Sequence, residues 1–351
     1  MNNHLRKLQC FFAFFVFLLS SLIIFNPLYA SDTPLVSLFA FLVTGTVLIS
    51  AICAVYKKTK SKALPAFMHI IFSILCCVLS VFLTLIMLTQ VIKETSYIAN
   101  RNISMFYYML FTVFVLMAGF YLCTRGFKGI YRFSIICFVF FALLLIASLT
   151  VFFSTKGIVK QSILSPIEKV TAKDLLAGFK AGVFVSLDSI FFIFCFEEYL
   201  IDGKQKLYRH VLLSAFFACF AFFGTIYIIM LLTFGKDIVQ QLRYPVFSLL
   251  KLVYAVDAVD LLSFTLIPAY MIKSSVYIYS SGICLNKALS KDKNNTKKII
   301  ASLHLCIPVI LSFIAIFFNN LPYGAFQHTV YIINAILCLL FIFVITEKKK
   351  H

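Results

Sequence analysis

Charged residues are scarce in this sequence. Asp, Glu, Lys and Arg make up only 13% of its 351 residues, whereas 62% are hydrophobic, and the mean hydropathy is +1.01. A soluble globule of this length needs more polar surface than so few charged residues can provide. The composition therefore excludes a soluble globular protein and predicts a polytopic membrane protein.

Acidic residues are rarer still, with 13 Asp and Glu against 31 Lys and Arg and a net charge of +18. Such an excess can indicate nucleic-acid binding, but here the basic residues are distributed between apolar runs. That distribution is the topology signal of a protein in an inner membrane. We therefore expect the lipid bilayer, and no nucleic acid, as a partner.

Metal-binding patterns are missing as well. None of the eleven cysteines forms a C-x-x-C pair, and no histidine stands at metal-ligand spacing from another ligand. The cysteines are interpreted as small, buried apolar side chains, so we predict no metal and no cofactor. The sequence also lacks Gly/Ser-rich or Pro-rich linkers, which predicts one integral membrane domain over residues 1–351.

Long apolar runs, in contrast, recur along the whole chain. Ten of them are long enough to cross about 30 Å of hydrocarbon, which predicts an all-α fold with ten transmembrane helices between residues 9 and 346. The runs lie near residues 9–28, 34–56, 66–92, 104–124, 130–153, 178–201, 211–234, 258–286, 299–318 and 328–346.

The basic residues also predict the topology. With both termini in the cytoplasm, 20 of the 31 Lys and Arg residues lie in cytoplasmic segments, ten lie in outer segments, and Lys273 is the remainder. The alternative for the N-terminus is a cleaved secretory signal. It would consist of Arg6, Lys7, the first apolar run and Leu28-Tyr-Ala-Ser31. Cleavage would leave nine spans and place the termini on opposite sides, so we expect the first span to be retained.

Lys273 stands near the middle of the apolar stretch 261–285. A lysine stem reaches about 6 Å, whereas either face of a bilayer would lie about 15 to 20 Å away along a helix. An ammonium at that depth costs at least about 2.5 kcal/mol on insertion scales. We therefore expect Lys273 to face a cavity, a counter-charge or a ligand.

Polar residues interrupt the first run at Ser20-Ser21 and the sixth at Ser186-Leu-Asp-Ser189. Ten spans with such interruptions are typical of the five-plus-five inverted-repeat, LeuT-like transporter fold, in which discontinuous first and sixth helices hold substrate near the midplane. We expect helix breaks at both places, and short outer helices within 154–177 and 235–257. The candidate ligand-binding residues are Ser20, Ser21, Ser186, Asp188, Ser189 and Lys273.

Asp188 lies about ten residues into its predicted span, where an ionised carboxylate is unfavourable unless it is paired, protonated or solvated. One interpretation is a group that faces the ligand or titrates during function. The other is a structural partner for a second polar side chain, for example Lys273. The residue pattern leaves both interpretations open.

Several segments resemble the B subunit of bacterial spore germinant receptors, a family of endospore germination permeases in the amino acid/polyamine/organocation superfamily. The most specific segments read Arg243-Tyr-Pro-Val-Phe-Ser-Leu-Leu-Lys-Leu252, then Asp260, then Lys273-Ser-Ser-Val-Tyr-Ile-Tyr279. Looser matches are Thr124-Arg-Gly-Phe-Lys-Gly-Ile-Tyr-Arg132 and Ile163-Leu-Ser-Pro166. The chain departs from the family in having no tryptophan, which the family often carries in span eight.

The resemblance implies a sensor rather than an enzyme. Such a subunit would bind a small germinant, typically an amino acid, in a transporter-like pocket in the spore inner membrane. It would act with a larger A subunit and a C-subunit lipoprotein to trigger germination. The alternative hypothesis is a stand-alone amino-acid permease, coupled to protons or ions, in which Lys273 and Asp188 titrate during transport.

In the sensor hypothesis, the ligand carboxylate would bind backbone N–H groups freed at the two helix breaks, and its amine would meet freed carbonyls or Asp188. Lys273 would occupy or border the position that sodium takes in related proteins, so its ammonium would replace the metal ion.

Overall fold

The computed structural model describes residues 3–24, 33–59, 67, 70–71, 74, 114, 117–154, 171–199, 206–235, 238–239 and 258–288. This part of the chain is helical and contains no strand. Its long helices are α1 (Asn3–Ile24), α2 (Pro34–Thr59), α5 (Phe127–Ser154), α7 (Ala172–Tyr199), α8 (Lys206–Phe234) and α11 (Ala258–Ala288). They coincide with six of the predicted spans. The predicted spans near 66–92, 104–124, 299–318 and 328–346 fall wholly or largely outside the described residues, so the count of ten remains a prediction.

Three of these helices contain segments long and apolar enough to cross a membrane, namely Leu35–Ala54, Phe127–Ser154 and Arg209–Phe234. On α5, the exposed side chains Ile136, Val139, Leu143 and Ile146 follow one another at spacings of three or four residues. That spacing places them on one helical face, which is apolar and therefore suited to contact lipid. The chain is a multi-pass membrane protein.

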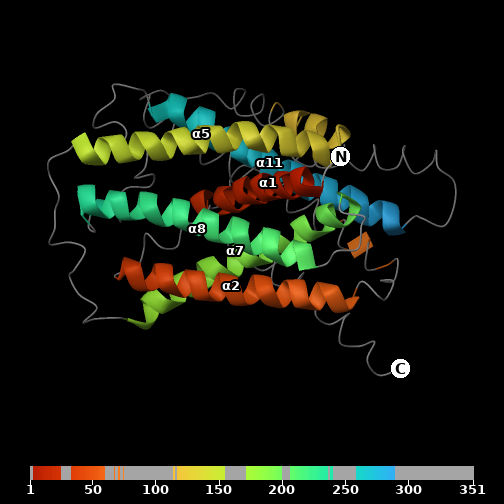
Figure 1. Cartoon of the computed structure of the whole chain (residues 1–351), viewed down its shortest axis with the longest axis horizontal. Coiled ribbons are helices and arrows are strands. Elements are labelled where there is room, and N and C mark those ends of the chain that lie inside the picture. Colours follow the sequence, from red (N-terminus) through yellow and green to blue (C-terminus); the bar gives the residue numbers. More distant parts are fainter. Residues whose placement is uncertain are drawn as a thin grey trace, which may run out of the picture.

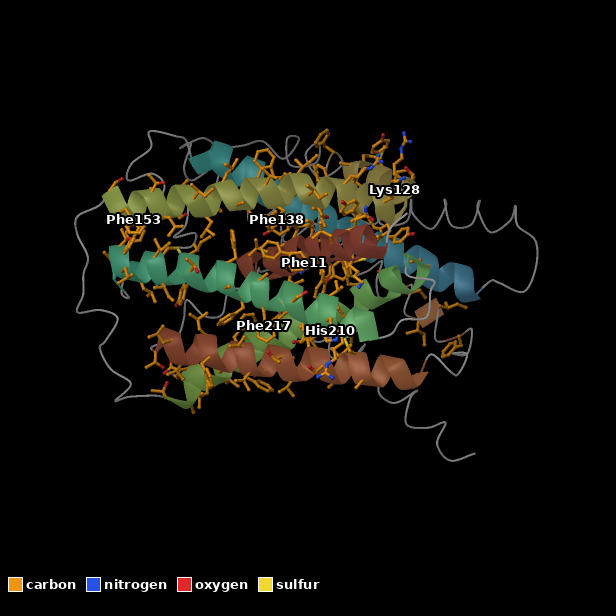
Figure 2. The ribbon with its side chains drawn as sticks, viewed as in Figure 1. Phe11, Lys128, Phe138, Phe153, His210 and Phe217 are labelled. Carbon is orange, nitrogen blue, oxygen red and sulfur yellow. The ribbon has the colours of Figure 1, made fainter. Side chains whose placement is uncertain are left out.

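The helices lie along the long axis of the molecule, with α5 and α8 running one way and α2, α7 and α11 the other (Figure 1). Residue contacts agree for α2 and α8, because Phe41 of α2 packs on Phe216 and Phe220 of α8. Gly45, one turn later in α2, lies against Phe216, so the two helices are antiparallel. Lys128, near the start of α5, and Phe153, near its end, mark the two ends of the bundle (Figure 2). Consecutive membrane crossings must alternate in this way.

Helix α1 lies in the middle of this arrangement (Figure 1). All of its side chains from Ala13 to Ser20 are buried. Phe15 contacts Phe138 of α5 and Phe222 of α8, while Phe14 contacts Phe192 of α7. A helix that is apolar on every side can satisfy all of its faces only when other helices surround it, which explains the central position.

Helices α2 and α7 run parallel and approach each other closely. A Cβ atom on Gly178 would collide with the carbonyl oxygen of Ser37, and one on Gly182 would lie 2.7 Å from Cβ of Thr44. Small residues four positions apart allow two helix backbones to pack closely in a membrane, where lipid tails provide little hydrophobic drive for association.

The structure corrects the outer-helix prediction for 154–177. Residues 172–177 are the first turns of the long helix α7 rather than part of a separate helix. The reason lies in Thr171, whose N–H and hydroxyl both donate to Asp174 and so start the helix at this point. Of the other predicted outer segment, 235–257, only residues 235 and 238–239 are described.

The predicted helix breaks are also absent from the described residues. Helix α7 continues through residues 186–189, and α1 continues through Ser20-Ser21 to Ile24. In α7 the hydroxyl groups of Ser186 and Ser189 donate to carbonyls of the preceding turn, so these serines are satisfied without unwinding the helix. Residues 25–32, which include Asn26-Pro27, lie outside the description.

Candidate functional site

Lys273 is enclosed by protein. It lies on α11 with 1% of its surface exposed. Its Nζ is 5.5 Å from the ring centroid of Phe17 on α1 and 6.0 Å from that of Tyr277, one turn further along α11. Both distances place the ammonium within reach of the negative faces of aromatic rings. The cation therefore faces the centre of the bundle rather than lipid.

The two rings that contact the ammonium belong to an aromatic cluster of Phe14, Phe17, Phe127, Phe192 and Tyr277, all buried. Phe17 lies 5.7 Å from Tyr277 and 5.5 Å from Phe192, while Phe192 lies 5.0 Å from Phe14 and 5.7 Å from Phe127. Through these contacts the cluster connects α1, α5, α7 and α11. The Lys273 ammonium lies at the junction of α1 and α11 within it.

The Lys273 ammonium is a strong electrostatic group in a buried environment. A desolvated cation–π contact contributes about 2 kcal/mol, whereas burying an ammonium costs several kcal/mol. The aromatic rings therefore offset only part of the cost of burying Lys273. They also exclude water, and a negative group brought to this ammonium would be attracted more strongly than it would be in solvent.

Two serines of α7 are buried inside the bundle, one turn apart. Ser186 and Ser189 are buried, and the Ser189 hydroxyl donates to the carbonyl of Ser186 at 2.5 Å. The Ser186 hydroxyl donates to the carbonyl of Gly182 at 2.6 Å and lies 3.4 Å from that of Gly45 on α2. Phe192 follows Ser189 by three residues, so Ser189 and the cluster share one face of α7, whereas Ser186 faces α2.

On α1, Ser20 is buried, and its hydroxyl donates to the carbonyl of Phe17 at 2.7 Å. The ring of the same Phe17 contacts Lys273. Ser20 follows Phe17 by three residues and therefore lies on the same face of α1 as the residue whose ring contacts Lys273. Ser21 and Asp188 belong to α1 and α7, but their side chains lie outside the described set.

The motif from Lys273 to Tyr279 is explained by packing as well as by charge. The Ser275 hydroxyl lies 3.3 Å from the carbonyl of Gly119, and the thiol of Cys123 donates to the carbonyl of Ser275 at 3.2 Å. A larger residue than serine would separate α11 from the helix that contains Gly119 and Cys123. Tyr279 extends the contact to Phe127, at 6.4 Å.

Sequence reasoning missed the aromatic cluster. Tyr277 could have been found, because residues four apart on a helix lie on one face and Lys273 was already singled out. Phe17 and Phe192 could not be distinguished in a chain with 42 phenylalanines. Within the described residues, no group of three or more His, Cys, Asp or Glu side chains is arranged to hold a metal ion.

Comparison with known proteins gives the family. A family model described as spore germination protein, a permease family, matches residues 4–322. The chain belongs to this family. No curated protein matches the sequence of this germination protein.

Among solved structures, the fold is similar to that of a Na⁺-coupled sialic acid symporter in a substrate-bound, outward-open state. The TM-score is 0.55 at 15% sequence identity, and the match covers 95% of this chain and 78% of the symporter chain. The germination protein therefore has an all-helical, LeuT-like transporter fold. Both matches are to permeases or transporters rather than to enzymes.

Proposed function

We propose that this chain is the germinant-sensing membrane subunit of a spore germinant receptor and that it binds a small amino acid. The observation that carries the proposal is the burial of Lys273 between α1 and α11, at the aromatic cluster and beside buried serines of α1 and α7. In LeuT-like proteins, substrate sites lie near the midplane of the membrane between these central helices. Membership of the germination family supports a sensing role over metabolic uptake.

The ligand carboxylate binds Lys273 in this proposal. The backbone N–H groups of residues 186–189 lie inside the continuous helix α7, so the sequence-based assignment of the carboxylate to freed amides is replaced. Ammonium–carboxylate contacts are strong in a site that aromatic rings keep dry. Asp188 takes the ligand amine, while Ser20, Ser21, Ser186 and Ser189 border the ligand.

A fixed ammonium also supplies a positive charge in place of a bound sodium ion. The response should therefore be the same in sodium and in choline buffers, although the symporter of similar fold is Na⁺-coupled. A requirement for sodium would reject this part of the proposal.

Membership of the germination family supports the partners that we infer. We infer a larger A subunit and a C-subunit lipoprotein in the spore inner membrane, with both termini of this chain in the cytoplasm. Ligand binding transmits a signal to these partners only if it changes the balance between two conformations of the subunit.

The second candidate is a stand-alone amino-acid permease, which the similarity to a symporter favours. Proteoliposomes that contain only this chain separate the two functions. Saturable binding of radiolabelled L-amino acids without accumulation is expected of the sensor, whereas accumulation inside the vesicles would establish the permease. Lys273→Met vesicles serve as the control for specific binding, and wild-type vesicles that neither bind nor accumulate would reject both functions.

A further inference from the structure

A second buried charge, Asp174, lies at the start of α7, far along the helix from the serine segment. Its side chain is fully buried. One carboxylate oxygen accepts the Thr33 N–H at 3.0 Å, and the other accepts the Thr171 N–H at 3.1 Å and the Thr171 hydroxyl at 2.8 Å. The Ser37 hydroxyl donates to the backbone carbonyl of Asp174 at 2.8 Å.

These bonds join two helices at one end. Thr33 immediately precedes α2, which begins at Pro34, and Thr171 immediately precedes α7, which begins at Ala172. Asp174 therefore accepts hydrogen bonds from the N-terminal residues of both helices. A carboxylate is favoured at a helix N-terminus, where backbone N–H groups and the helix dipole present positive charge, and here two such ends converge on one carboxylate.

After Asp174, small residues recur every four positions on the face of α7 toward α2, at Gly178, Gly182 and Ser186. The two glycines occupy steric notches against Ser37 and Thr44 of α2. A slide of α7 by one turn would bring one glycine to the other's notch, but the notch left behind would then receive the Cβ atom of Ser186 or of Asp174. The notches therefore oppose a slide, most strongly at the backbone carbonyl of Ser37 and less at the side chain of Thr44.

The Asp174 bonds add a directed constraint on the same register. Only the observed register of α7 on α2 places the Asp174 carboxylate on the Thr33 N–H. A slide of one turn would break this hydrogen bond between a buried carboxylate and a backbone N–H. Breaking a buried, hydrogen-bonded charge is expensive, and single buried polar residues are known to specify register between helices. We propose that Asp174 is a positioning residue that sets the axial register of α7 on α2.

The consequence for the binding site rests on the proposed function. Ser186 and Ser189 lie three to four turns along α7 from Asp174, about 18 to 23 Å at 1.5 Å per residue. A rigid helix transmits an axial displacement over this distance without loss. Asp174 therefore sets the level of the serine segment relative to Lys273 on α11.

The register can be measured without any ligand. Spin labels are introduced through a keto-bearing unnatural amino acid at Val47 of α2 and Phe179 of α7, two exposed positions, so the native cysteines remain. The full-length chain is studied in nanodiscs by double electron–electron resonance. We expect one narrow distance distribution for the otherwise unchanged chain and a broadened or two-peaked distribution for Asp174→Ala, because a one-turn slide moves a helix by about 5.4 Å.

The exposed neighbour provides the matched control, since Lys173→Ala should leave the distribution narrow. If Asp174→Ala does not fold, Asp174→Asn keeps the volume and one acceptor and should give an intermediate width. If the distance distribution of Asp174→Ala is identical to that of the unchanged chain, the proposal is overturned. If the alanine variant does not fold, an Asp174→Asn distribution identical to that of the unchanged chain overturns it instead.

A second readout links the register to sensing. Spores that carry Asp174→Ala are exposed to a mixture of the twenty L-amino acids. The apparent affinity for a ligand falls in proportion to the fraction of molecules in the binding-competent state. If about a tenth of the variant molecules keep the native register, the amino-acid concentration for half-maximal germination rises about tenfold, while the maximal response is retained. Absence of any response in wild-type spores would count against the proposed function alone, because the distance measurement does not depend on a ligand.

Discussion

Asp174 and Lys273 are both buried charges in the central helices, yet their surroundings differ in kind. Asp174 receives three directed hydrogen bonds on its carboxylate from Thr33 and Thr171, with fixed distances and donors. The described contacts of the Lys273 ammonium include two aromatic faces at 5.5 and 6.0 Å. A ring face attracts a cation over a broad range of positions, whereas a hydrogen bond weakens steeply when its angle changes.

The difference indicates different tasks. Directed bonds from two helix ends select one geometry, which suits a residue that holds two helices in register. Aromatic faces tolerate displacement, so these two contacts do not by themselves fix the position of the Lys273 ammonium. The surroundings of a buried charge, rather than its burial alone, therefore distinguish a structural role from a role in binding.

The largest expected effect is that of Lys273→Met. Methionine has a similar volume and no charge, so the substitution removes the ammonium without leaving a large cavity. We expect the germination response to amino acids to be lost while the purified protein still folds, as a cooperative melting transition would show. Lys180→Met, at an exposed position of α7, is the matched control and should retain the response. An unchanged response in Lys273→Met would refute the binding role.

Next in size is the effect of Gly178→Ala, which tests the packing between α2 and α7 below Asp174. The added methyl group would meet the backbone carbonyl of Ser37, which cannot move aside cheaply. We expect destabilisation of about 1–3 kcal/mol, measured as a lower melting temperature in detergent. Gly224→Ala in α8 is the control, because no atom lies within 4 Å of the added group there. Its stability should stay the same or rise, and equal behaviour of the two variants would contradict close helix packing at Gly178.

A smaller effect is expected for Asp188→Asn, which asks whether the second carboxylate of α7 resembles Asp174 or Lys273 in its task. If it recognises the ligand amine, loss of its charge should weaken amino-acid binding about tenfold or more, at unchanged melting temperature. Equilibrium binding to proteoliposomes measures this, and Asp188→Glu should restore part of the affinity. A loss of stability with unaltered affinity would instead assign Asp188 to packing.

The smallest effect belongs to Phe17→Leu, which removes one aromatic face from the ammonium. We expect amino-acid affinity to fall about two- to fivefold, which is less than the full value of a desolvated cation–π contact, because the Tyr277 ring still faces the ammonium. Phe12→Leu serves as the control, because Phe12 packs on Phe138 of α5, at 4.7 Å, outside the aromatic cluster. If both variants bind the amino acid equally well, the ring face contributes nothing specific to the site.

Much of the fold could be predicted from the sequence. Apolar runs long enough to span a bilayer are visible without any tertiary information, and six of them appear as helices close to the expected bounds. Lys273 could be singled out for the same reason, because an ammonium within an apolar run has a high cost wherever the run is placed. The family resemblance rested on local motifs and was confirmed by the match over residues 4–322.

Other features could not be predicted. Ser186 and Ser189 were expected to interrupt a helix, but a hydroxyl can donate to its own preceding turn, and the sequence does not reveal which option the neighbouring helices favour. Asp174 was assigned to a separate outer helix. Its partner Thr33 is 141 residues away along the chain, so the bond between them leaves no local signal.

The sequence by itself determined that this chain crosses a membrane many times and carries a cation at depth, because both follow from transfer free energies that depend only on residue type and run length. Tertiary structure alone decided what surrounds each buried charge. Aromatic rings from α1 and α11 meet Lys273, and the ends of α2 and α7 meet Asp174, since contacts between helices depend on their register and orientation in three dimensions.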